Sequence, residues 1–426
     1  MPRLVIRNGR VIDPAGGVDE VRDVAIDDGI VAAVEPGIEP GTAEEFDATG
    51  LVVAPGFIDM HVHLREPGFE YAETIESGSR AAAAGGFTSI CCMPNTQPVN
   101  DNATVTRFIV ETAWRMAQVN VYPIGAITNG SAGTELAAFG SMKQAGIVAV
   151  SDDGRPVMNA RIMRRAMEAA AALGLTVINH CEDLDLSAGG DMHEGIASVR
   201  RGLRGIPASS EDVMVARDIL LAELTGARYH VAHISSRRAI EMVAYARAHG
   251  LHVTSEATPH HFALSDAEMP PYDSNYKMKP PLRSPEHVQA VSDGIASGAI
   301  DAIATDHAPH PGSEKMQEFE RCPFGIIGLE TALGLALENL VHTGRISLAR
   351  MVELFTSGPA RILNLDRGTL RRGATADLTI FDPELKWTYD VNRSHSKSRN
   401  TPFHGHTFRG GPVATIVGGS VVWSVD

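Results

Sequence analysis

The chain has few cysteines and no long hydrophobic run. Its 426 residues include only four cysteines, with no CxxC pair among them: Cys91, Cys92, Cys181 and Cys322. This pattern excludes a disulfide scaffold and indicates buried thiols in a reducing compartment. No run reaches the ~18 apolar residues that a membrane span needs, and the N-terminus lacks the apolar core of a signal peptide. We therefore expect a soluble, cytoplasmic protein.

An excess of positive charge is also missing. The formal net charge is −15 and the pI is near 5.6, which argues against a nucleic acid partner, because such binding depends on Lys and Arg contacts to phosphate. The hydrophobic fraction of 44% and the charged fraction of 21% are those of a globular protein. This length favours one large domain and a smaller one.

Between residues 54 and 366, short apolar runs alternate with helix-like segments. The eight runs are 57–63, 87–93, 121–127, 147–151, 176–180, 229–233, 252–256 and 301–305. Amphipathic stretches such as 159–173 and 210–224 follow the helical period. Eight β-then-α units predict an α/β fold, a (β/α)₈ TIM-like barrel. The alternative is a doubly wound open sheet, but no G-x-G-x-x-G turn follows the first run.

Both chain ends are typical of β-structure. Runs 4–7 and 10–12 flank Asn8-Gly9, and runs 24–26 and 30–34 flank 27–29, so each pair is predicted to form a hairpin. The tail has further runs at 377–381, 414–417 and 420–423. We predict that residues 1–53 and 367–426 form a small β-sandwich domain beside the barrel of residues 54–366.

Histidine and aspartate residues stand at the C-terminal ends of the predicted strands. They are His61, His63, Asp152, Asp153, His180, His233 and Asp306. A single His-x-His pair would be a weak metal signal, but catalytic groups of such barrels gather at this end. The set predicts a site for Zn²⁺ or a similar ion. His260, His261 and His307 lie near other strand ends and can be satisfied polar residues only.

Four histidines and two aspartates exceed the ligand number of one tetrahedral zinc. A carboxylate bridging two ions is typical of two-metal hydrolytic sites, in which bound water becomes hydroxide at neutral pH. The residues alone do not separate Asp152 from Asp153 as the bridge. Asp306 is the natural proton shuttle. We infer metal-assisted hydrolysis of an amide-like bond.

A separate set of side chains is suited to an anion. Arg65 offers a bidentate fork for a carboxylate, and Asn95 and His310 can add donors. The alternative for Arg65 is a surface ion pair with Glu66 or Glu70.

Several motifs resemble those of the dihydroorotases of the amidohydrolase superfamily. They are GFIDMHVHLREPG at 56–68, MPNT at 93–96, PPLR at 280–283, DHAPH at 306–310, PFG at 323–325 and NTPF at 400–403. The resemblance spans the chain. It implies a zinc enzyme of pyrimidine synthesis that interconverts N-carbamoyl-L-aspartate and L-dihydroorotate.

The resemblance also assigns roles to residues. It implies that one zinc is held by His61, His63 and Asp306, a second by His180 and His233, and that Asp153 and a hydroxide bridge them, since the carboxylated lysine of hydantoinases is absent. It places His63, Arg65, Asn95, His310, Phe324 and Gly325 on the substrate. Lys279, a point charge where the family often has asparagine, would join them.

Other functions remain open at this point. One is a different cyclic amidase, of hydantoinase or allantoinase type. Another is a non-catalytic partner of aspartate transcarbamoylase, against which the complete ligand set argues. The resemblance implies a homo-oligomer and allows an aspartate transcarbamoylase partner. The charged segment 311–321 is either a lid over the site or a plain surface loop.

Overall fold

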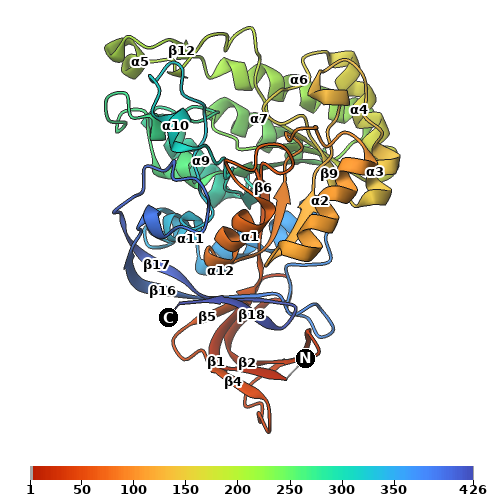
Figure 1. The fold of residues 1–426 in the computed structure, drawn as a ribbon, viewed down its shortest axis with the longest axis vertical. Coiled ribbons are helices and arrows are strands. Elements are labelled where there is room, and N and C mark those ends of the chain that lie inside the picture. Colours follow the sequence, from red (N-terminus) through yellow and green to blue (C-terminus); the bar gives the residue numbers. More distant parts are fainter. Residues whose placement is uncertain (1–2, 426) are drawn as a thin grey trace.

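The computed structural model describes residues 3–425 and places a barrel above a curved terminal sheet (Figure 1). The barrel strands are β6 (Phe57–Val62), β7 (Phe87–Cys92), β8 (Asn120–Pro123), β9 (Ala149–Val150), β10 (Thr176–Asn179), β13 (Tyr229–Val231), β14 (Val253–Ala257) and β15 (Ala302–Ile303). Parallel pairing joins β6–β7–β8 and β9–β10–β13–β14–β15. The single bridges Gly125↔Val150 and Val62↔His307 connect the two groups. The predicted (β/α)₈ barrel is confirmed.

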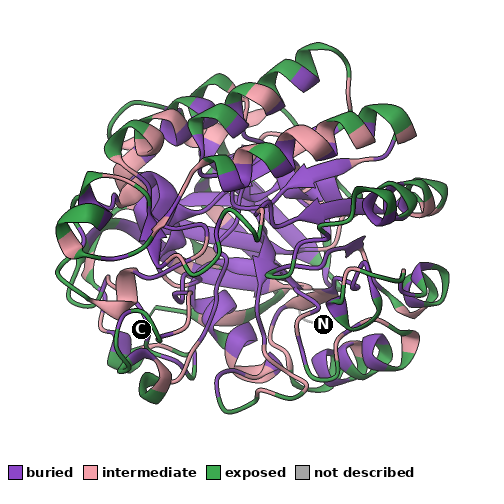
Figure 2. Ribbon diagram, turned by 90° about the horizontal axis from the view of Figure 1, so that it is seen from above, coloured by how far each residue is buried: buried purple, intermediate pink, exposed green. Residues whose placement is uncertain are grey.

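Helices surround these strands and expose only their outer faces, as the view from above shows (Figure 2). The main ones are α1 (Ile75–Ala84), α2 (Ala103–Met116), α3 (Phe139–Ala145), α4 (Ala160–Leu173), α6 (Ser209–Thr225), α7 (Arg237–Ala248), α9 (Pro285–Ser297) and α12 (Leu348–Phe355). Helix α4 begins where Asn159 accepts from the amides of Arg161 and Ile162, and it ends at Gly174, whose φ is 66°. Such caps satisfy the free backbone groups at helix ends.

Shorter elements lie in the loops. Between β10 and α6 the chain makes an excursion through β11 (Met192–His193), α5 (Ile196–Arg201) and β12 (Gly205–Ile206), visible at the upper left of Figure 1. The other short helices are α8 (Pro259–Ala263), α10 (Gly312–Lys315), α11 (Ala332–Ala336) and α13 (Ser357–Leu363). Within residues 3–425, no helix has both the length and the apolar character needed to cross a membrane.

The two chain ends form one sheet. Its order is β18 (Ser420–Ser424), β17 (Thr407–Val417), β16 (Leu378–Thr388), β5 (Val52–Pro55), β1 (Leu4–Asp13), β2 (Val18–Asp27) and β3 (Ile30–Glu35), with β4 (Glu44–Asp47) also paired to β1. Antiparallel pairing of Pro55 with Leu378 joins the ends. Residues of both halves, including Ile6 and Ile416, share one core. The boundaries 1–53, 54–366 and 367–426 stay a prediction.

The hairpin predicted at Asn8-Gly9 is wrong. Strand β1 continues through both residues, and its register against β2 shifts between Ile6 and Gly9. Asn8 adopts a φ of 62° and its amide donates to Asp23 Oδ1, so the pair forms a bulge within a strand. The predicted hairpin β2–β3 is present. The C-terminal runs also pair with each other, as the antiparallel strands β17 and β18.

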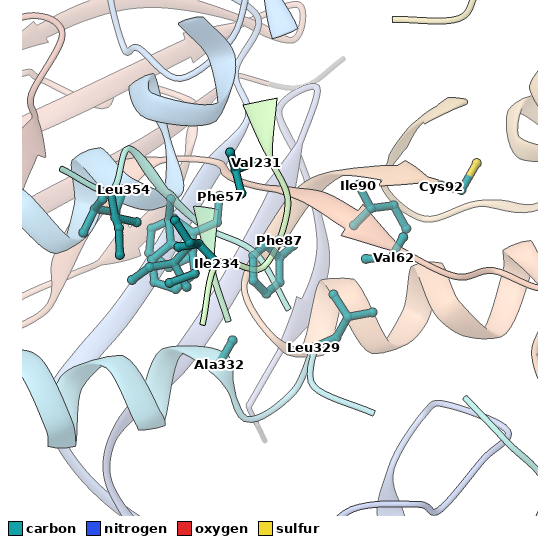
Figure 3. Close-up of a cluster of buried hydrophobic side chains, with 14 of the residues drawn as sticks. Phe57, Val62, Phe87, Ile90, Cys92, Val231, Ile234, Leu329, Ala332 and Leu354 are labelled. Atoms are coloured by element: carbon teal, nitrogen blue, oxygen red, sulfur yellow. The ribbon is translucent and has the colours of Figure 1, made fainter. Parts of the chain in front are cut away.

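Buried hydrophobic side chains, among them Phe57 and Phe87, join the barrel floor to the sheet (Figure 3). Phe57 stands at the start of β6. The centre of its ring lies 5.1 Å from that of Phe355 of α12, 5.9 Å from that of Phe381 of β16 and 6.2 Å from that of Phe87 of β7. Thr379 Oγ1 accepts from the Phe57 amide and donates to the Gly86 carbonyl. Strand β6 therefore starts at this contact and runs away from the terminal sheet (Figure 1). His61 lies near its far end, and His63 follows it.

Candidate functional site

The histidines of β6 face two aspartates at the far end of the barrel. His61 Nε2 lies 3.4 Å from Asp153 Oδ1 and 3.5 Å from Asp306 Oδ1. His63 Nε2 lies 3.0 Å from Asp306 Oδ1 and 3.5 Å from Asp153 Oδ2. Residues from strand ends one, four and eight of the barrel thus converge, as parallel strands that end at one rim should.

Two further histidines also approach Asp153. His180 follows β10, and its Nδ1 lies 2.9 Å from His233 Nε2. These two atoms lie 3.8 and 3.7 Å from Asp153 Oδ1. Two groups have the spacing of a metal site: His61, His63 and Asp306, and His61, Asp153 and His233. The structure therefore brings all six predicted ligands together around Asp153.

The chemistry of this cluster fits a cation. Its six side chains are buried, and within residues 3–425 neither His61 Nε2 nor Asp153 Oδ1 has a hydrogen-bond partner. Burial alone would raise the pKa of Asp153 and of Asp306, but the charges of the surrounding histidines outweigh it and hold both pKa values below the ordinary range. Imidazole nitrogens and carboxylates in a buried cluster are ligands that Zn²⁺ prefers.

Asp152 and Asp153 point to different surroundings. Asp152 Oδ1 accepts from the amides of Ile127 at 2.8 Å and Thr128 at 3.1 Å, and Oδ2 accepts from the Thr128 hydroxyl. Asp152 therefore fixes the loop after β8, whereas Asp153 lies among the histidines.

Sequence reasoning missed two buried glutamates behind the histidines. Glu256 ends the seventh predicted strand, and its Oε1 accepts from His61 Nδ1 at 2.8 Å. Glu182 Oε2 accepts from His180 Nε2 at 3.0 Å. Burial raises the pKa of each glutamate, but the neighbouring histidines lower it by more, so that each pKa lies at about 2. Two features of the sequence could have indicated these glutamates: Glu182 stands two residues after His180, and Glu256 stands at the end of an apolar strand.

Asp59 receives a structural role. Its carboxylate accepts from the Thr305 hydroxyl at 2.6 Å and from the Thr305 amide at 3.1 Å. Burial raises the pKa of Asp59 to about 7. The bonds tie β6 to the residue before Asp306.

The predicted anion residues lie beside the cluster. Arg65 donates to the Pro309 carbonyl at 3.2 Å, and its guanidinium lies 3.4 Å from His310 Nε2. Within the described chain Arg65 has no ion pair with Glu66 or Glu70; Glu66 instead accepts from the Ile75 amide. Asn95 Oδ1 lies 2.9 Å from His63 Nδ1. Asn95 therefore contacts one of the predicted metal-ligating histidines.

Three of these residues have unusual backbones. The φ angles are 63° at Arg65, 32° at His233 and 48° at Asp306. Positive φ is costly for residues with a Cβ and is concentrated at functional sites.

Asn400, from the C-terminal segment, holds two predicted substrate residues. Its Oδ1 accepts from the His310 amide at 3.1 Å, and its Nδ2 donates to the carbonyls of Ala308 at 2.9 Å and Gly325 at 3.0 Å. It is buried. The NTPF motif at 400–403 was a signal at this position, but it gave Asn400 no role.

Lys279 lies beside Glu182 and Phe324, and its role toward the substrate stays a prediction. Its Nζ is 2.9 Å from Glu182 Oε1 and 5.0 Å from the centre of the Phe324 ring. The segment 311–321 contains α10, and buried Lys315 donates to the carbonyls of Pro323 and Gly325 at 2.9 and 3.1 Å. The lid role stays a prediction.

Comparisons with known proteins agree with this site. A family model described as "Dihydro-orotase-like" matches residues 50–239, and one described as "Amidohydrolase family" matches residues 323–423. The chain is 71% identical to a dihydroorotase of Solibacter usitatus, with 99% of this chain and 98% of the relative covered. It is 55% identical to a dihydroorotase of Pelotomaculum thermopropionicum, covering 99% and 98%.

A solved structure also has this fold. The L-hydantoinase (dihydropyrimidinase) of Arthrobacter aurescens superimposes with a TM-score of 0.88 at 26% identity, and the match covers 100% of this chain and 96% of that one. With a full-length curated relative at 71% identity and a complete cluster of histidines and aspartates, the chain belongs to the dihydroorotase family.

Proposed function

We propose that this chain catalyses the reversible cyclisation of N-carbamoyl-L-aspartate to L-dihydroorotate. The single observation that carries the proposal is the intact cluster around Asp153 with Arg65 beside it. The cluster can hydrolyse an amide, and the cationic Arg65 beside it can bind a carboxylate. Together they match a cyclic amide substrate that bears a carboxylate. The curated relatives of this chain are named dihydroorotases.

We infer that the cluster holds two Zn²⁺ ions. His61, His63 and Asp306 would hold one, and His180 and His233 the other, with Asp153 between them. When bound, Zn²⁺ polarises the amide carbonyl and makes water nucleophilic at neutral pH. The lack of hydrogen-bond partners for His61 Nε2 and Asp153 Oδ1 within the described residues supports this assignment.

Asp306 is the proton carrier in this proposal. Its low pKa leaves the carboxylate ionised at neutral pH and able to take a proton from the attacking water. It then delivers that proton to the ring nitrogen that leaves. In the direction of ring closure, Asp306 removes the proton from the attacking carbamoyl nitrogen.

Arg65, Asn95 and His310 would orient the substrate carboxylate. Arg65 offers a planar fork, and the contact with the Pro309 carbonyl leaves other guanidinium donors for a ligand. Burial and the nearby Arg65 charge lower the pKa of His310 to about 3, so its ring is neutral and acts through hydrogen bonds. Phe324 and Gly325 would line the adjoining wall.

The deciding experiment is a coupled assay on dihydroorotate with zinc measured on the same sample. We expect turnover, bound zinc, and a loss of about 10²–10⁴-fold in kcat for Asp306→Asn, which is the usual contribution of a positioned proton carrier. Turnover of hydantoin or allantoin in place of dihydroorotate would contradict the substrate. Near-native kcat in zinc-loaded Asp306→Asn would contradict the proton role.

We further infer a cytoplasmic homo-oligomer. Candidate contact residues in such an assembly are Trp114 of α2 and Leu220 of α6, which are 86% and 65% exposed. Light scattering of the purified chain, alone and with aspartate transcarbamoylase, tests both self-association and that partner.

A further inference from the structure

Glu256 determines which nitrogen of His61 can carry a proton. The carboxylate is fully buried and its Oε1 lies 2.8 Å from His61 Nδ1. Its Oε2 lies 3.3 Å from His230 Nε2, and His230 Nδ1 lies 2.8 Å from Thr254 Oγ1. An ionised carboxylate only accepts hydrogen bonds, so His61 Nδ1 must donate and the lone pair of a neutral ring sits on Nε2. That nitrogen faces Asp153 and Asp306.

Glu182 imposes the reverse arrangement on His180. Its Oε2 lies 3.0 Å from His180 Nε2, which must therefore donate. The lone pair of the neutral ring then sits on Nδ1, the nitrogen that lies 2.9 Å from His233 Nε2 and 3.8 Å from Asp153 Oδ1. The second oxygen of Glu182 is held by Lys279 Nζ at 2.9 Å.

The other tautomers would be strongly disfavoured. They would place a ring lone pair against a buried carboxylate oxygen at 2.8 Å for His61 and 3.0 Å for His180. Repulsion of this kind is barely screened in an interior from which water is excluded. Each glutamate thus fixes the tautomer of one histidine of the cluster.

We propose that Glu256 and Glu182 are positioning residues that hold His61 and His180 in opposite tautomers. Both rings then turn a lone pair toward Asp153. Lys279 binds Glu182 rather than substrate. This inference rests on the proposed metal site. It assigns the glutamates to metal affinity, because a carboxylate behind a ligating histidine fixes the ring and raises its basicity.

The test uses the isosteric variants Glu256→Gln and Glu182→Gln. A glutamine amide can turn its NH₂ toward the ring and stabilise the wrong tautomer. We expect each variant to bind Zn²⁺ about 10–100-fold more weakly in competition with a chromophoric chelator, while the metal-free melting temperature stays close to that of the parent. The matched control is Asp23→Asn, which alters a buried carboxylate that accepts from the amides of Asn8 and Ile38, remote in sequence from the proposed metal ligands.

Lys279→Met provides a second measurement, at a partly exposed side chain. If Lys279 acts through Glu182, the variant weakens zinc binding and the KM of the zinc-saturated enzyme stays within about twofold. A raised KM with unchanged zinc affinity would assign Lys279 to substrate and overturn that part of the inference.

The outcomes separate the two proposals. If the parent chain binds no Zn²⁺, the metal site of the proposed function falls, and the inference with it. If the parent binds Zn²⁺ and both glutamine variants match it in affinity, only the tautomer assignment is overturned. If the control Asp23→Asn weakens zinc binding as much as the two variants do, the effect is one of general stability and the assignment is also overturned.

Discussion

Asp152 and Asp153 are neighbours in the chain, yet they contact different parts of the molecule. One carboxylate accepts from the Ile127 and Thr128 amides and the other lies among the histidines. Sequence reasoning found the pair, because acidic residues at a barrel strand end are a visible pattern. It could not choose between them, since that choice depends on how the turn after β9 orients two adjacent side chains.

The difference between the two aspartates is measurable. Asp153→Asn removes the charge shared by both proposed metal positions, so we expect zinc content after dialysis to fall to a small fraction of the parent value. Asp152→Asn keeps an oxygen for the two amides, and we expect near-parental zinc content with a loss of about 1 kcal/mol in unfolding free energy, the scale of one hydrogen bond. Equal zinc content in the two variants would contradict the assignment.

His193 gives a prediction about pH. Burial, with the charges of Arg283 and His287, lowers the pKa of His193 to about 3, whereas an unfolded histidine has a pKa of about 6.5. Between these two pKa values the unfolded chain binds a proton at His193 and the folded chain does not. The contribution of neutral His193 to the free energy of unfolding is therefore lost as pH falls below about 6.5.

We expect His193→Gln to remove this contribution. Its amide oxygen can accept from Arg283, which lies 3.3 Å from His193 Nδ1. Denaturant unfolding at pH 7.5 should give similar free energies for the two proteins. At pH 5 the parent should have lost about 2 kcal/mol more than the variant, the product of 1.5 pH units and about 1.4 kcal/mol per unit. Parallel pH profiles would show that His193 titrates normally in the folded chain.

At the scale of elements, local patterns predicted the barrel well because its strands are short apolar runs with polar ends. The Asn8-Gly9 signal failed for a physical reason: the residues that pair with β1 lie in β2, whose ten residues run past the bulge. Glu256, Glu182 and Asn400 were missed because their roles depend on contacts between segments distant in sequence.

Asn400 connects the C-terminal segment to the substrate side of the site, so its loss should affect binding more than chemistry. In Asn400→Ala the carbonyls of Ala308 and Gly325 lose their donor and the His310 amide loses its acceptor. We expect KM for dihydroorotate to rise by about tenfold with a smaller change in kcat, and zinc content to remain parental. A fall in kcat alone, at unchanged KM, would contradict this role.

At the scale of the whole molecule, the barrel and the terminal sheet are joined with little free space. Gly56 lies between β5 of the sheet and β6 of the barrel, and a Cβ there would approach Thr88 Oγ1 to 2.0 Å. We expect Gly56→Ala to lower the unfolding free energy by about 1–3 kcal/mol through overpacking.

The matched control for this change is Gly140→Ala in α3. A Cβ at Gly140 meets no atom within 4 Å, and alanine favours helix by about 1 kcal/mol over glycine. Thermal melting should therefore move in opposite directions in the two variants. An unchanged melting temperature for Gly56→Ala would indicate that the backbone at this junction can shift to accommodate the added methyl group.

The pairing of Pro55 with Leu378 has a consequence for synthesis of the chain. Strands β1, β2 and β5 leave the ribosome first, but the strands that complete their sheet and cover their core come last. At about 5–20 residues per second, the delay is on the order of half a minute. Throughout that interval the chain acquires every proposed metal ligand while Ile6 and Val53 lack the cover supplied by Ile380 and Ile416. A message truncated after residue 370 would thus encode a complete set of proposed ligands on a chain in which β5 lacks its neighbour β16 and the core of the first-made strands stays partly uncovered. Such a chain is a natural substrate for chaperones and proteases.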